Sequence, residues 1–218
     1  MKFALTDKDG TRTVHTLKPF KDLTLADYGK FHNEPWPEGL DGFQHAVEYI
    51  ARTTGAPKKK LLRLPVKDIE MLATKALEAM GKIAEAEQKP VGHSFTFKRE
   101  TYFIPGNLEA LPWEYWHTMV NVLWPNCEKE VDTYATSLAV FCLKEGEDLD
   151  DVDIEARKSL FMGLPCSVAL GTCAFFFNRS QRYRDAISPH LSRITRSRLH
   201  SVAPMWTSSL ETTAQPST

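Results

Sequence analysis

The sequence lacks the short motifs that mark the common enzyme classes. It contains no Walker A or G-x-G-x-x-G nucleotide loop and no G-x-S-x-G nucleophile motif. Its seven histidines are scattered, and none forms an H-x-x-x-H or H-E-x-x-H pair or lies at metal-ligand spacing from a cysteine. We therefore predict a protein that is not an enzyme and that needs neither a cofactor nor a metal.

The chain also has few cysteines and almost no net charge. Four cysteines lie among apolar neighbours and form no C-x-x-C pair: Cys127, Cys142, Cys166 and Cys173. This pattern indicates buried, reduced thiols in a cytosolic protein. The formal net charge is −1, so no overall electrostatic attraction to nucleic acid or to an acidic membrane is expected. The N-terminus has no apolar run typical of a signal peptide, and we predict that the protein stays in the cytoplasm in which it is made.

Long apolar runs are absent except at residues 160–177, which are eighteen residues without a charge. That length reaches the lower limit for a membrane-spanning helix, and three arginines follow it. Gly163, Pro165 and Gly171 dilute its hydrophobicity, however. We predict a buried or partner-facing helix and no membrane contact, and we keep a single membrane span as the alternative.

The apolar patterns and capping residues of the sequence predict an α+β protein that is mostly helical. Residues 3–17 alternate apolar and polar residues around Asp9-Gly10, which indicates a β-hairpin. Thr24 and Asp27 have the spacing of a capping box, and a helical apolar face follows Asp41. The longest amphipathic stripe follows Leu64-Pro65 and runs to Ile83.

The same order then recurs. Residues 94–105 indicate a second hairpin, residues 108–124 and 130–143 two helices, and Leu164-Pro165 precedes a third. Tyr115 lies 87 residues after Tyr28, whereas the two Leu-Pro pairs lie 100 residues apart, so the second copy carries about 13 extra residues near 144–158. We predict two tandem, diverged modules, each a β-hairpin followed by about three helices.

The predicted modules have the following boundaries. Module 1 covers residues 1–88, and module 2 covers residues 93–200 and ends in a basic helix. Residues 201–218 are rich in serine and threonine, have little apolar content, and are predicted to form a disordered tail.

Charge is concentrated in two segments of the second module. Residues 145–155 hold seven carboxylates without the central glycine of a calcium-binding loop, which indicates a solvated loop. Residues 178–200 hold six arginines against one aspartate: Arg179, Arg182, Arg184, Arg193, Arg196 and Arg198. These arginines are candidate contacts to an anionic partner, either an acidic protein surface or, as the less favoured alternative, nucleic acid.

Aromatic residues supply the candidate partner-binding anchors, because large aromatic side chains dominate the energetics of protein interfaces. They lie on the predicted helix 108–124, at the end of the apolar segment and in the tail: Trp113, Trp116, Trp124, Phe175, Phe176, Phe177 and Trp206.

Two stretches carry a resemblance to a known family. The segment F-T-F-K-R-E-T-Y-F-I-P, followed by W-E-Y-W, resembles the openings of small tail-assembly proteins of tailed bacteriophages. In the first module, T-G-x-P followed by L-x-x-L-P-x-x-D is similar in style. The resemblance covers about residues 10–185 by pattern, with few identities.

The resemblance implies a non-enzymatic protein that binds phage tail or other virion proteins. Such a protein acts either as a tail-assembly chaperone or as a structural component at the head–tail junction or inside the head. It has no catalytic residues, and the sequence leaves its oligomeric state open.

Overall fold

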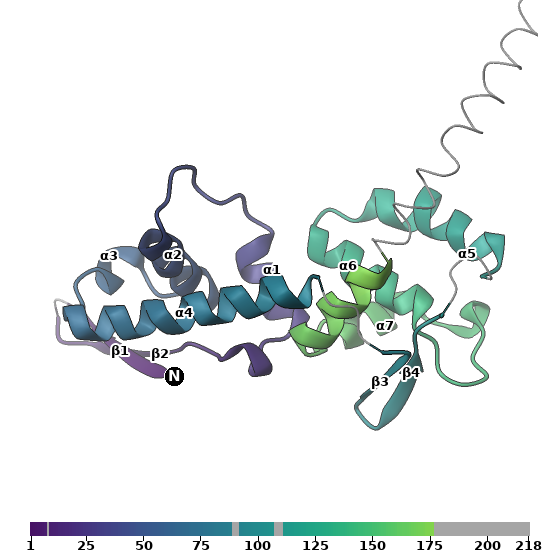
Figure 1. Cartoon of the computed structure of the whole chain (residues 1–218), viewed down its shortest axis with the longest axis horizontal. Helices are drawn as coiled ribbons and strands as arrows, with labels where there is room; N and C mark the ends of the chain where they lie inside the picture. The colour runs from purple at the N-terminus through teal and green to yellow at the C-terminus, as the bar shows by residue number, and fades with distance from the viewer. Residues whose placement is uncertain (8, 89–91, 107–110, 177–218) are drawn as a thin grey trace, which may run out of the picture. The chain divides into compact units, whose positions relative to one another are not determined.

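The structure, a computed structural model, describes residues 1–176 except residues 8, 89–91 and 107–110 and the side chains of Trp113, Val120 and Asn121. The described chain is α+β and mostly helical, as the sequence predicts. Met1–Phe176 form one compact unit, in which two short hairpins accompany the helices (Figure 1).

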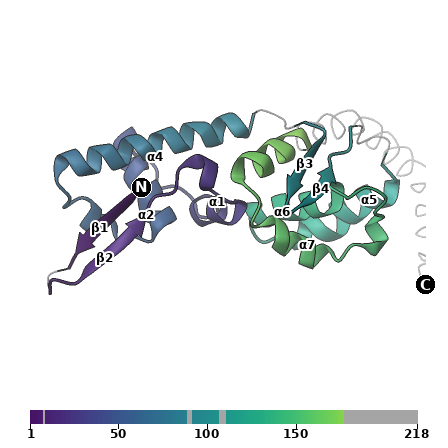
Figure 2. The ribbon, with the colours of Figure 1, turned by 90° about the horizontal axis from the view of Figure 1, so that it is seen from below.

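Both predicted hairpins are present, and each is a separate two-stranded antiparallel sheet (Figures 1 and 2). The first pairs β1 (Lys2–Thr6) with β2 (Arg12–Thr16), and Gly10 in its turn has φ 85°, a conformation that glycine adopts without strain. The second pairs β3 (Ser94–Phe97) with β4 (Glu100–Phe103). Its Phe95 faces Tyr102, and the two rings stack with centroids 5.4 Å apart.

The helices of the first half begin at the residues that the sequence indicates. A capping box of Thr24 and Asp27 opens α1 (Leu25–His32), and a second one, of Asp41 and Gln44, opens α2 (Gly42–Thr54). Gly55, at φ 70°, ends α2. Two further helices follow: α3 (Lys58–Leu61) and α4 (Val66–Ala86), whose apolar stripe packs against α2.

The predicted helix 108–124 is not one regular helix. It begins as α5 (Trp113–Thr118), widens into a π-helical turn, η3 (Met119–Leu123), and tightens into the 3₁₀ turn η4 (Trp124–Asn126). Pro112 directly precedes α5, and Pro125 is the second residue of η4. Pro112 disfavours helical geometry at the residue before it, and Pro125 has no N–H to continue an α-helix.

The rest of the second half contains α6 (Glu130–Phe141), the 3₁₀ turn η5 (Leu149–Asp151), α7 (Ile154–Phe161) and helical residues from 166 to 176. The uncharged segment 160–177 is therefore not a single helix. It is broken at residues 162–165, where Gly163 and Pro165 stand. Within the described residues, none of the helices has the length and apolar content to cross a membrane.

The two Leu-Pro motifs have the same local backbone structure. We define the first Leu-Pro step as residues 61–66 and the second as residues 161–166. In both, a helix ends at the first residue, a turn follows, and the next helix starts directly after the proline. The backbone hydrogen bonds match at an offset of 100 residues. Leu64 N donates to Leu61 O at 3.1 Å, and Leu164 N donates to Phe161 O at 2.9 Å. After the proline, Asp68 N donates to Pro65 O at 2.9 Å, and Val168 N donates to Pro165 O at 3.0 Å.

The second step is covered by the beginning of α1. Leu25 N donates to Leu164 O at 3.0 Å, and Ala26 N donates to Met162 O at 2.9 Å. In return, Cys166 N donates to Leu23 O at 2.8 Å. An element of the first predicted module thus packs on the second. The structure does not confirm two tandem modules, and the boundaries 1–88, 93–200 and 201–218 stay a prediction.

Candidate partner-binding surfaces

The aromatic residues of α5 and η4 lie between the core and solvent. The Trp116 ring lies 5.4 Å from that of Phe141 on α6, and the Trp124 indole N–H donates to Ser137 Oγ at 3.1 Å. Both tryptophans are half-buried, whereas Val122 between them is 48% exposed. One side of each tryptophan is therefore held by α6, and an exposed apolar side chain lies on the same segment. The Trp113 side chain lies outside the described residues.

The aromatic residues at the end of the apolar segment have different environments. Phe176 is only 1% exposed, and its ring lies 5.0 Å from that of Phe141, so it belongs to the core. Phe175 is half-buried, with its ring 5.7 Å from that of Phe176. Phe175 is thus the more accessible of the two.

The other predicted contact residues cannot be placed. Phe177, Trp206 and the six arginines lie outside the residues that the structure describes: Arg179, Arg182, Arg184, Arg193, Arg196 and Arg198. Their roles stay predictions.

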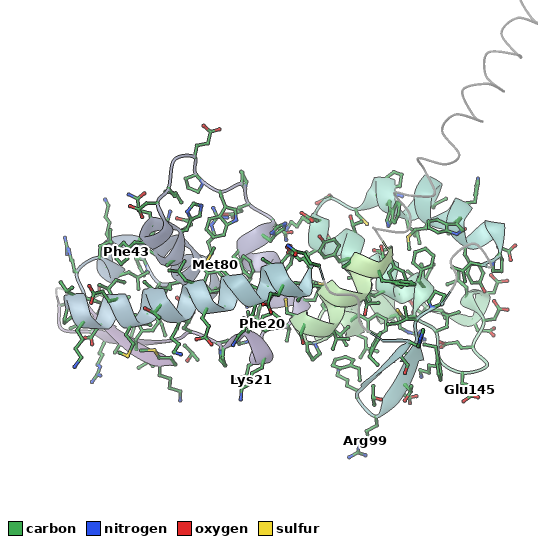
Figure 3. All side chains as sticks on the ribbon, in the orientation of Figure 1. Phe20, Lys21, Phe43, Met80, Arg99 and Glu145 are labelled. Atoms are coloured by element: carbon green, nitrogen blue, oxygen red, sulfur yellow. The ribbon has the colours of Figure 1, made fainter. Side chains whose placement is uncertain are left out.

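The acidic segment 145–155 is anchored to the fold at two points. The Tyr115 hydroxyl of α5 donates to Asp148 Oδ1 at 3.0 Å and accepts from Leu149 N at 3.3 Å. Arg157 binds both carboxylate oxygens of Glu147, at 2.9 and 2.5 Å, and these hydrogen bonds lower the pKa of Glu147 despite its partial burial. The other carboxylates of the acidic segment remain at the surface, and Figure 3 shows Glu145 pointing away from the ribbon.

Two buried carboxylates, those of Asp27 and Glu48, form ion pairs that stabilise the fold. Burial alone would raise the pKa of Asp27, but hydrogen bonds from Lys18 (2.6 Å), Lys30 (3.0 Å) and Thr24 lower it to about 2. Glu48 is paired with Arg52 and Lys58, which lower its pKa against the effect of burial. Each carboxylate is thus charged and satisfied at neutral pH, as buried charges require.

The cysteines are free thiols, and three of them are buried. Burial raises the pKa of Cys166 to about 12 and raises that of Cys142 and Cys173 as well. These three thiols are therefore protonated at neutral pH and poorly nucleophilic. Among the described residues, no group of three His, Cys, Asp or Glu side chains could hold a metal ion.

The sequence reasoning missed an exposed apolar surface on the first Leu-Pro step. Leu62 is 60% exposed and Val66 is 71% exposed. Lys59, Arg63 and Lys67 are exposed in the same short stretch. The signal was present in the sequence, because Leu62 and Val66 are apolar residues in a strongly basic segment.

No family model matches this sequence, and no match is found among the curated proteins or the solved structures.

Proposed function

We propose that this chain is a non-enzymatic bacteriophage protein that acts through protein–protein contacts in tail assembly, in the manner of a chaperone. The proposal rests on the resemblance of residues 95–116 and 54–68 to tail-assembly proteins. In this function the chain covers an apolar surface of a tail subunit until polymerisation of the tail displaces it.

The segment from α5 to η4 is the surface that we propose to bind the tail subunit, because of how its side chains are arranged. Its half-buried Trp116 and Trp124 are anchored on α6, and Val122 is 48% exposed between them. Rigidly held aromatic side chains beside an exposed apolar residue suit an interface, because little side-chain entropy is lost on binding. The π-helical turn on which Val122 lies is a backbone feature that is frequent at functional sites.

The first experiment is mass spectrometry of purified phage particles beside an infected-cell lysate, with this protein counted relative to the major tail protein. An assembly factor is abundant in the lysate and absent from particles. A fixed copy number in particles contradicts the chaperone role and favours a structural component.

The surface is tested with Val122→Glu, which places a charge in the proposed interface. We expect affinity for the isolated tail subunit to fall at least about tenfold. Val14→Glu is the matched control, because Val14 is 62% exposed on β2, away from this segment. Trp116→Ala, checked by circular dichroism for an intact fold, should also weaken binding. Equal binding by the two valine variants would show that η3 is not the contact.

A structural virion protein at the head–tail junction or inside the head is the second candidate. The six arginines between residues 178 and 200 favour it, since they could contact DNA or an acidic virion protein. Retention on DNA that weakens steeply with salt supports the DNA version. No retention at low salt removes it.

A further inference from the structure

The two Leu-Pro steps share their backbone bonds but differ in what covers them. At the second step, Met162 O and Leu164 O accept from the first two residues of α1, and Cys166 N donates to Leu23 O just before that helix. Leu164 is 1% exposed. The matching atoms of the first step are Leu62 O, Leu64 O and Val66 N. Among the described residues, no hydrogen bond is found for any of these three. The first step therefore presents a copy of a surface that is covered elsewhere in the same chain.

A hollow beside the first step adds to this surface. A cavity of about 660 Å³ lies between the β1–β2 hairpin and the first step, lined by Leu5, Asp7, Lys60, Arg63 and Leu64 among others. At the second step the β3–β4 hairpin packs directly on the first residue of the step. Phe95 and Tyr102 pack on Phe161 at centroid distances of 5.9 and 4.9 Å.

Basic residues in and next to the first step are only partly neutralised by ion pairs among the described residues. Lys58 pairs with Glu48 and Lys60 with Asp7. No ion pair is found for Lys59, Arg63 or Lys67 among the described residues. We call the exposed group the step surface: Lys59, Leu62, Arg63, Val66 and Lys67. It is a small apolar patch with a basic border.

A complementary surface lies on the second half of the chain. Glu145, Asp150 and Asp151 are exposed, and no ion pair is found for them among the described residues. Phe103, 45% exposed, lies at the start of this acidic loop, because its N–H donates at 2.8 Å to the carbonyl oxygen of Leu143, two residues before Glu145. We call this group the loop surface: Phe103, Glu145, Asp150 and Asp151. It combines an exposed aromatic ring with an acidic border.

We propose that the step surface of one chain binds the loop surface of a second copy, so that the protein associates head to tail. Opposite charges on the two surfaces select this pairing, and burial of Leu62 and Val66 against Phe103 adds affinity. Because the contact joins two different surfaces, every dimer still has one free step surface and one free loop surface. Further chains can therefore add to it unless the assembly closes into a ring. This inference goes beyond the proposed function and holds for either candidate.

The test uses charge reversals in the full-length chain and measures weight-average mass by sedimentation velocity over a concentration series at low salt. The unmodified chain should grow in mass with concentration, and the growth should weaken as salt screens the charges. Lys59→Glu with Arg63→Glu should weaken association at least about tenfold, and so should Asp150→Lys with Asp151→Lys. A chain with all four substitutions restores complementarity and should regain association.

The matched control is Lys2→Glu with Lys21→Glu, which makes the same change in charge at exposed positions that belong to neither surface; Figure 3 labels Lys21. It should associate like the unmodified chain. A protein that is monomeric at every concentration overturns the proposal. So does association that survives the step reversal, or a four-substitution chain that stays monomeric.

Discussion

The first and second Leu-Pro steps have one local structure in two environments. Both break a helix, turn, and restart a helix after a proline with matching hydrogen bonds. The second step is covered by the beginning of α1, whereas the first leaves Leu62 and Val66 exposed to solvent. Local sequence thus determines the backbone of the step. Its burial depends on a neighbour that is distant along the chain.

The largest expected effect is a loss of stability at the second step. Leu164→Ala removes a side chain that is 1% exposed and should lower the free energy of unfolding by about 2–5 kcal/mol. Leu64→Ala, at the matching half-buried position of the first step, should cost only about 1 kcal/mol. Urea unfolding monitored by circular dichroism measures both. Equal losses would mean that the two steps are equally buried in solution.

The next effect concerns Asp27, next to the residues that cover the second step. Its folded-state pKa of about 2 lies below the ordinary 3.8, so its ionised form stabilises the fold above pH about 4. This contribution, about 2 kcal/mol, is lost as the pH falls from about 4 toward 2. The difference in unfolding free energy between the unmodified chain and Asp27→Asn should therefore shrink over that range. Asp41→Asn, which alters the cap of α2, is the control, and a difference independent of pH would contradict the prediction.

A smaller effect on stability is expected from replacing either of two helical glycines by alanine, and its sign should differ between them. A Cβ at Gly29 of α1 would lie 3.0 Å from Val131 Cγ1, whereas one at Gly81 of α4 would meet no atom within 4 Å. Gly81→Ala should raise the free energy of unfolding by about 0.5–1 kcal/mol, because alanine favours the helix. Gly29→Ala should lower it, since α1 and α6 must separate. Thermal unfolding of the two variants provides the measurement, and an equal gain for both would show that α1 is loosely packed.

The smallest effect on stability is expected at the first step. Leu62→Ser should change the free energy of unfolding by no more than about 0.5 kcal/mol, because Leu62 is 60% exposed. The same substitution should reduce self-association, since it removes apolar area from the step surface. Unfolding and sedimentation experiments on one preparation measure both quantities. A large loss of stability would place Leu62 in the core rather than on a contact surface.

Much of the local structure could be predicted from the sequence. The capping pair Thr24 and Asp27, the end of α2 at Gly55 and both hairpins are where the residues indicate. These features depend on neighbours a few residues apart, so the chain carries the signal locally.

Apolar content alone does not ensure a continuous helix. Residues 160–177 and 108–124 were predicted as single helices, yet the first is broken at residues 162–165 and the second changes to π and 3₁₀ geometry. Glycine and proline determine these breaks. Of the predicted anchors, Phe176 lies in the core because Phe141 covers it, a contact between residues 35 positions apart.

Local sequence is sufficient for the α+β class, the capping of the helices and the recurrence of the Leu-Pro step. These depend on hydrogen bonds and steric limits within a few residues. Tertiary contacts determine which step is covered, because the donors to Met162 O and Leu164 O come from α1, more than 130 residues earlier in the chain. Packing across such a distance leaves no local pattern, so the difference in burial between the two steps is visible only in the folded chain.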